Sequence, residues 1–246
     1  MDLRIAARVS SVGGTPVRQA IIFLHGTEGD GFLVYDDVKQ FFGSEEKMKL
    51  LYTEIIFPTA PEQKYTPLLE DRWNAWYDRE GVPINSCEKF ETVAYGAGLV
   101  ANLIVGLEAK GIPRNKIILG GRSSGGSMAI FVGYHFLPGL GGIFAVSSHI
   151  HKESFLFKDI RRDPSGSLPP LLMYNWKADT YILHCWGKTT YDKLSELGVK
   201  GEFRSVRGIH VGMDVEEVKG IFDWCKSIFV SVLRESFLGQ GFSPSP

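Results

Sequence analysis

Short apolar runs alternate with longer amphipathic segments along most of this chain, and this alternation restricts the fold more than any other feature. The apolar runs are rich in β-branched residues, several of them end at Gly or Pro, and they cover residues 19–26, 53–58, 116–121, 141–148, 170–176 and 201–208. Such runs are typical of strands that are buried on both faces. The alternation predicts an α/β fold in which a mostly parallel central sheet carries helices on both faces.

The segments between these runs have helical spacing, at residues 34–51, 85–113, 125–137, 181–197 and 214–234. In the second of them, Asn85 with Glu88 three residues later predicts a capping box, and Gly111 followed by Pro113 predicts the end of the helix. Residues 59–84 are rich in Pro and aromatic residues and have no clear period. We expect this stretch to be an irregular connection.

Length and composition favour one domain that spans residues 1–246, with a flexible tail from about residue 238. The 27 basic and 28 acidic residues nearly balance, which gives no indication of a nucleic-acid partner. Charges within the first ten residues make a poor secretory signal, and no apolar run approaches the roughly 18 residues of a membrane span. The three cysteines are widely separated, as expected in a reduced compartment. We therefore expect a cytoplasmic protein without an integral membrane segment.

Residues 121–125 match the pattern G-x-S-x-G at the end of a predicted strand and the start of a predicted helix. In a nucleophile elbow the serine occupies a sharp turn, and glycines two residues before and after it avoid collisions with neighbouring backbone. This pattern makes Ser123 a candidate nucleophile, whereas Ser124 has Arg122 where the first glycine is needed. A Ser/Gly cluster also forms ordinary turns, so the pattern needs support from the rest of the chain.

A serine nucleophile needs a base and an oriented acid, which follow it along the chain in the order acid, then histidine. Asp179 and Asp214 are the acids nearest to strand ends, and His210 follows the last predicted strand. We predict the triad Ser123, Asp179 and His210. The alternatives are a helix N-cap for Asp179 and an ordinary surface loop for His210.

Hydrolysis of an acyl bond also requires donors for the oxyanion. The backbone N–H of Ser124 follows the nucleophile directly, and Thr27 lies in the glycine-containing loop 24–31 after the first strong apolar run. We predict these two N–H groups as the oxyanion hole, with Leu24 and Gly26 of the same loop among the substrate contacts.

The blocks IIFLHGTEGDG, IIFPTAP, WNAWYDR, IILGGRSSGGSMAI and GIFAVSS occur in this order. In them the chain resembles the acyl-protein thioesterase and lysophospholipase family, closest to its lysophospholipase-like branch, from about Ala20 to Trp224. The resemblance implies the α/β-hydrolase fold and the same triad, with Trp76 near the acyl site. The chain departs from the family at Arg122 and Ser124, and in the acid-bearing stretch NWKAD. Beside the nucleophile, Arg122 would attract an acidic substrate; we expect instead that it lies over the following helix and faces solvent.

These features predict a serine hydrolase that cleaves acyl esters or thioesters through an acyl-enzyme, in lipid metabolism and including the depalmitoylation of S-acylated proteins. The alternative is a non-catalytic binding protein that uses the same fold to hold a ligand. No cofactor is indicated. His149 and His151 lie two residues apart but lack a nearby acidic or cysteine ligand, so we predict no metal site. We expect a monomer or a weak dimer.

Overall fold

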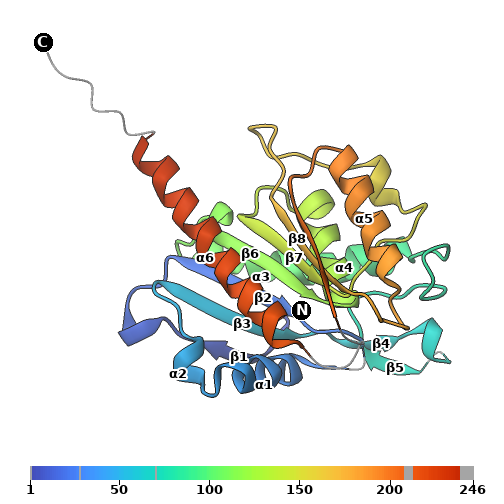
Figure 1. Ribbon diagram of the computed structural model, residues 1–246, viewed down its shortest axis with the longest axis horizontal. Helices are drawn as coiled ribbons and strands as arrows, with labels where there is room; N and C mark the ends of the chain where they lie inside the picture. Colours follow the sequence, from blue (N-terminus) through green and yellow to red (C-terminus); the bar gives the residue numbers. More distant parts are fainter. Residues whose placement is uncertain (1, 28, 70, 208–212, 239–246) are drawn as a thin grey trace, which may run out of the picture.

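The computed structural model describes residues 2–27, 29–69, 71–207 and 213–238, with side chains described up to Val230. Its central sheet has seven strands (Figure 1), and all neighbouring strands run parallel except the first pair, which is antiparallel. In spatial order the strands are β1 (Arg4–Val9), β3 (Thr53–Thr59), β2 (Gln19–Leu24), β6 (Ile117–Arg122), β7 (Gly142–Val146), β8 (Leu171–Trp176) and β9 (Gly201–Val206). This arrangement confirms the predicted α/β fold.

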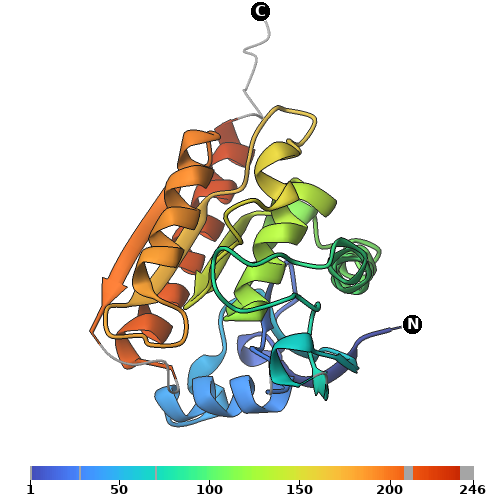
Figure 2. The same cartoon turned by 90° about the vertical axis from the view of Figure 1, so that its right-hand side faces the viewer.

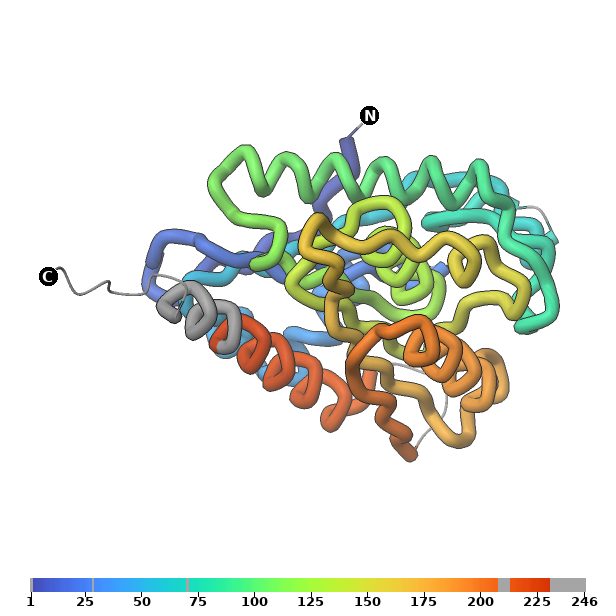
Figure 3. The backbone as a smooth tube through the Cα atoms, turned by 90° about the horizontal axis from the view of Figure 1, so that it is seen from above, coloured from blue at the N-terminus to red at the C-terminus, as the bar shows by residue number. Residues whose placement is uncertain are grey.

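Different helices bury the two faces of the sheet. One buried cluster contains side chains from α1 (Gly31–Phe42), α2 (Glu45–Met48) and α6 (Val215–Leu238). The other contains side chains from α3 (Phe90–Glu108), α4 (Ser124–Phe131) and α5 (His184–Glu196). Figure 3 shows α3 and α6 on opposite sides of the strands, and Figure 2 views α3 nearly along its axis.

The strands predicted from continuous apolar runs are buried on both faces. Every residue of β7 and β8 is buried, as is every residue of β2 after Gln19. The sequence analysis missed β1. This edge strand has arginines at its exposed positions, Arg4 and Arg8, so it lacks the continuous apolar run by which the other strands were predicted. The sequence analysis also missed the small hairpin of β4 (Glu62–Lys64) and β5 (Arg72–Asn74) inside the stretch expected to be irregular.

Two predicted helix boundaries are wrong. The capping box at Asn85 does not form, because α3 begins at Phe90 and the Glu88 carboxylate instead accepts a hydrogen bond from Ser154 Oγ. The single helix expected at 34–51 is divided at Gly43, whose φ of 76° ends α1 in the left-handed region. The predicted end of α3 is supported by Gly111, which has φ 90° and donates its N–H to the Glu108 carbonyl.

The apolar helix α3 is buried along one side only. Of the described helices, α3 is the one that is long and apolar enough to cross a membrane by length and composition, and 39% of its apolar window is buried in the fold. Five of its residues, Val93, Ala97, Val100, Ile104 and Leu107, belong to the core cluster that it shares with α4 and the strands. The helix therefore serves as a packing layer of this fold.

Gly96 lets α3 approach the segment that carries Trp76. A Cβ at position 96 would collide with the backbone carbonyl oxygen of Trp76 and lie 2.9 Å from the Met128 side chain. Gly98, on the exposed side of the same helix, has no such neighbour within 4 Å. The two glycines thus form a matched pair for testing this contact.

We expect Gly96→Ala to lower the free energy of unfolding by about 1–3 kcal/mol, because the added methyl overpacks a buried contact. Gly98→Ala should instead raise it by up to about 1 kcal/mol, since alanine has the higher helix propensity and meets no obstacle. Urea denaturation of both variants measures the difference. Equal shifts in the same direction would contradict the close approach of α3.

Candidate active site

Ser123 occupies a strained turn between β6 and α4. Its φ of 52° and ψ of −123° place a residue with a side chain outside the usual backbone regions. The turn is held by a 2.8 Å hydrogen bond from Ser123 N–H to the Val146 carbonyl, and Ser148 Oγ donates to the Ser123 carbonyl at 2.9 Å. This is the local geometry expected of a nucleophile elbow.

Glycines allow the end of β2 to lie directly against this turn. A Cβ at Gly121 would lie 2.5 Å from the Leu24 carbonyl oxygen, and a Cβ at Gly125 would lie equally close to that same oxygen. A Cβ at Gly26 would lie 3.3 Å from Ser123 Cβ. The glycines of the G-x-S-x-G pattern are therefore required by backbone contact, which is the reason that the sequence pattern suggested.

The loop after β2 contains a backbone donor, the Thr27 N–H, that points away from the Gly26 carbonyl. That carbonyl accepts hydrogen bonds from His25 Nδ1 at 2.6 Å and from Gly29 N–H at 3.2 Å. Because the peptide unit is planar and trans, the Thr27 N–H points the opposite way. Within the described part of the chain, this N–H has no hydrogen-bond acceptor. Thr27 Oγ1 also donates to Ser124 Oγ at 2.9 Å, which ties the loop to the first residue of α4.

His25 fixes this loop as a neutral, fully buried side chain. Ala60 N–H donates to His25 Nε2 at 2.9 Å, so the ring proton is on Nδ1, where it is donated to Gly26. Burial lowers the pKa of His25 to about 4, although its contact with the Gly26 carbonyl opposes that shift. The sequence analysis did not identify this role, because the buried partners of the ring come from elsewhere in the chain.

The predicted substrate contacts occupy two different environments. Gly26 borders a cavity that also contains Ser123, whereas Leu24 and Trp76 are fully buried. Trp76 Nε1 donates to the His25 carbonyl at 2.8 Å, and the two rings are 5.1 Å apart. These contacts give Trp76 an observed role in positioning the loop, and direct substrate contact by Trp76 or Leu24 stays a prediction.

The cavity next to Ser123 has a volume of about 410 Å³ and a partly charged wall. Its described lining includes Thr27 and Ser123, the apolar side chains of Leu33, Val34 and Met213, and the charged side chains of Asp37, Arg79 and Arg122. The expected solvent-facing position of Arg122 is wrong, because this side chain borders the cavity and is half-buried. Burial lowers its pKa, and the carboxylates of Glu217, Asp37 and Asp179 oppose that shift.

Asp179 follows the carboxyl end of β8, as the sequence predicts for the acid. It is buried, and its Oδ1 accepts hydrogen bonds from the N–H groups of Tyr181 at 2.9 Å and Ile182 at 2.8 Å. It is not the N-cap of α5, which begins at His184. The other candidate acid, Asp214, accepts from Glu216 N–H and so caps the start of α6. His210 lies outside the described residues.

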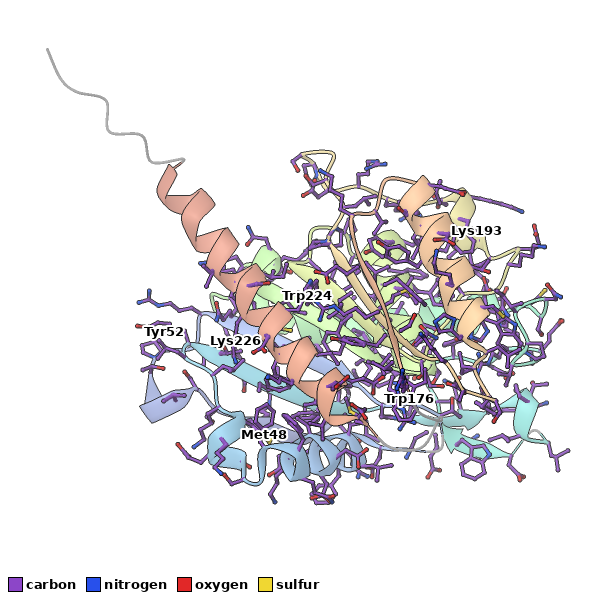
Figure 4. All side chains as sticks on the ribbon, viewed as in Figure 1. Met48, Tyr52, Trp176, Lys193, Trp224 and Lys226 are labelled. Atoms are coloured by element: carbon purple, nitrogen blue, oxygen red, sulfur yellow. The ribbon has the colours of Figure 1, made fainter. Side chains whose placement is uncertain are left out.

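A buried carboxyl group holds the start of α6 beside β8. Glu217 accepts hydrogen bonds from Trp176 Nε1 and from Asp214 N–H, and Trp176 is seen near the first turn of α6 in Figure 4. Burial raises the pKa of Glu217 to about 7, against the opposing effect of these hydrogen bonds. Glu217 thus fixes the residues that follow the segment containing His210. Its bond to Asp214 N–H has a local signal, the capping-box spacing of Asp214 and Glu217, whereas its bond to Trp176 has none.

A family profile described as phospholipase/carboxylesterase matches residues 7–228. Among individual relatives, lysophospholipase-like protein 1 of Mus musculus is 31% identical over 83% of this chain and 84% of its own length. Acyl-protein thioesterase 1 of Yarrowia lipolytica is 27% identical over 83% of this chain and 89% of its own length. These matches confirm the resemblance inferred from the sequence.

Solved structures agree on the fold. SOBER1 of Arabidopsis thaliana superposes with a TM-score of 0.75 at 23% identity, covering 87% of this chain and 100% of that chain. Acyl-protein thioesterase 2 of Zea mays superposes with a TM-score of 0.73 at 23% identity, covering 90% and 97%. The predicted α/β-hydrolase fold is confirmed.

The neutral state of His25 predicts a specific pH dependence of stability. Its pKa is lowered from 6.5 to about 4, so the unfolded chain binds the proton more readily, and this contribution is lost as pH falls from 6.5 towards 4. Between about pH 8 and about pH 5, wild type should lose roughly 2 kcal/mol more unfolding free energy than His25→Gln. Denaturant titrations at both pH values measure this, and parallel curves for the two proteins would exclude a buried neutral His25.

Proposed function

Because this chain belongs to the phospholipase/carboxylesterase family, we propose that it cleaves acyl esters or thioesters with the triad Ser123, His210 and Asp179. It is a serine hydrolase of carboxylic ester or thioester bonds. The observation that carries the proposed site is the strained Ser123, which borders a cavity beside a Thr27 N–H that has no acceptor among the described residues. Backbone strain and an unpaired donor each destabilise the free protein. In acyl transfer the strained turn exposes the nucleophile and the donor can bind the oxyanion.

In the proposed mechanism His210 accepts the proton of Ser123 Oγ as this oxygen attacks the carbonyl carbon of the substrate. The C–O or C–S bond to the leaving group then breaks, and His210 returns the proton to the departing alkoxide or thiolate, which leaves as the alcohol or thiol. A water molecule attacks the acyl-enzyme in the same way and releases the acid. Asp179, held by the N–H groups of Tyr181 and Ile182, orients the imidazole and stabilises its charged form.

The Thr27 and Ser124 N–H groups are the proposed donors to the tetrahedral oxyanion. Ser124 is the first residue of α4, where backbone N–H groups have no partner within the helix and the helix dipole favours negative charge. The hydrogen bond from Thr27 Oγ1 to Ser124 Oγ holds the two residues together. This contact supports an oxyanion hole whose donors are fixed before substrate binds, which is the condition for effective transition-state stabilisation.

The described wall of the cavity favours short or polar acyl groups over long alkyl chains. Three charged side chains, Asp37, Arg79 and Arg122, share this wall with a few apolar ones, and burying a long chain against them would leave charges poorly solvated. S-acylated proteins are a second substrate class, favoured by the acyl-protein thioesterases among the relatives. We retain a cytoplasmic location and a monomer or weak dimer as proposals.

A fluorophosphonate probe tests the nucleophile. We expect wild type to be labelled, Ser123→Ala to lose labelling, and its ester hydrolysis to fall by about 10⁴-fold or more, because no other residue supplies the attacking oxygen. Ser124→Ala is the matched control and should still be labelled, although more slowly, because it keeps the backbone N–H but loses the hydrogen bond from Thr27 Oγ1. Labelling of Ser123→Ala, or no labelling of folded wild type, would reject the proposal in favour of a binding protein.

A series of thioesters and esters with acyl groups from acetyl to palmitoyl tests the substrate class. We expect kcat/KM to be highest for short acyl groups and to decline with length, because a longer chain displaces water from the charged wall at a cost that exceeds the about 0.8 kcal/mol gained per buried CH₂. A steady rise towards palmitoyl would contradict this expectation and support S-acylated proteins instead.

A further inference from the structure

Arg79 places an almost completely buried cation on the wall of the cavity that contains Ser123. Its side chain is only 2% exposed, yet it borders the cavity. The guanidinium Nε donates to Tyr65 Oη at 2.8 Å, and the group lies over the rings of Tyr65 and Tyr77 at 5.7 and 6.0 Å. The hydroxyl and the two rings fix the direction of the side chain.

The rest of this guanidinium has no protein partner among the described residues. Neither Nη1 nor Nη2 donates a hydrogen bond there, and neither is among the side-chain atoms that are sealed from solvent without a partner. Both terminal nitrogens therefore keep access to the cavity. A guanidinium has five donor hydrogens in a rigid fork, and one hydrogen bond leaves most of them available.

Arg79 and Arg122, the two cations in the described lining of the cavity, differ in the carboxylates that act on them. Arg122 interacts with the carboxylates of Glu217, Asp37 and Asp179. No described carboxylate forms an ion pair with Arg79. Burial acts to lower the pKa of Arg79, and the main groups that raise it are the tyrosines Tyr77, Tyr65 and Tyr181, not carboxylates. A buried cation without a counter-ion is costly, and an anion that enters the cavity would offset that cost.

The imidazoles near Arg79 do not neutralise it. His149 and His151 are buried with ring centroids 5.3 Å apart, and the Nε2 atom of each has no hydrogen-bond partner among the residues that the structure describes. Burial and the positive charge of Arg79 lower the pKa of both rings, to about 4 for His151. The two imidazoles beside Arg79 are thus neutral at neutral pH and add no charge to it.

We propose that Arg79 is a specificity residue that binds a carboxylate on the substrate, so that the preferred ester or thioester is anionic. A carboxylate would accept two parallel hydrogen bonds from the free edge of the guanidinium, the geometry that arginine recognises best. The carboxylate can be carried by the acyl group or by the leaving group, and the same fork would recognise either. The proposal rests on hydrolysis at Ser123.

Matched substrate pairs test it. For the acyl side, the 4-nitrophenyl monoester of adipic acid is compared with that of adipamic acid; for the leaving-group side, 4-acetoxybenzoate is compared with 4-acetoxybenzamide. In wild type we expect kcat/KM to favour the carboxylate by about tenfold or more in one of the pairs. Which pair shows the preference identifies the side, and ratios near one in both pairs would overturn the proposal.

Substitutions then assign the preference to Arg79. Arg79→Met should abolish it and Arg79→Lys should reduce it, because lysine keeps the charge but lacks the fork. Arg18→Met is the matched control, since Arg18 also lies over a tyrosine ring, that of Tyr52 at 5.4 Å, but is exposed and borders no part of this cavity. Each ratio compares two substrates on one protein, so partial unfolding cancels. If Arg79→Met does not fold, an unchanged ratio in Arg79→Lys would overturn the assignment.

Direct binding separates this proposal from the proposed function. Calorimetry should show that adipate binds wild type and Ser123→Ala alike, that adipamide does not bind, and that Arg79→Met loses adipate binding. Absence of hydrolysis with intact adipate binding would reject the hydrolase while supporting the anion site. Active hydrolysis without adipate binding, and with equal rates on both substrates of each pair, would reject the anion site alone.

Discussion

The contact between the end of β2 and the β6–α4 turn is the constraint on which the site depends. The two strands are parallel neighbours in which Leu24 pairs with Gly121, so the loop after β2 must leave the sheet directly over the turn that carries Ser123. Glycine at positions 121 and 125 permits this approach, and a Cβ at either position would force the backbones apart. The proposed oxyanion donors come from these two segments, so their separation is set by backbone packing, which is stiffer than any side-chain arrangement.

A layer of buried hydrogen bonds transmits this rigidity to the rest of the fold. The His25 ring is hydrogen-bonded to Ala60 and Gly26, and the backbone carbonyl of His25 accepts from Trp76 Nε1. The backbone carbonyl of Trp76 in turn lies against α3 at Gly96. Both ring nitrogens of His25 and the Trp76 indole N–H are paired in the neutral state of the imidazole, and an imidazolium could not accept the Ala60 N–H. The pKa of His25, lowered to about 4, keeps this arrangement intact over the neutral range.

The sequence predicts those parts of the fold and site that local chemistry determines. Strands such as β2 and β8 are buried on both faces and so read as continuous apolar runs, and the elbow glycines follow from the turn itself. The failures have distant causes. Glu88 is used by Ser154 rather than by its own helix, and Arg122 borders the cavity, where carboxylates from α1, α6 and the Asp179 loop act on it. The sequence gives no local signal that Glu217 pairs with Trp176 or that His25 pairs with Ala60.

The charges around the cavity have unequal effects on the two parts of a hydrolytic reaction. A cation near Ser123 stabilises any developing oxyanion, so Arg122 and Arg79 would both assist neutral and anionic esters in the transition state. Only a cation without a protein counter-ion also gains from binding an anion in the ground state, because a balanced one must first give up its existing interactions. Selectivity for charge therefore belongs to Arg79, whereas Arg122, surrounded by three carboxylates, contributes a field that changes little when substrate arrives.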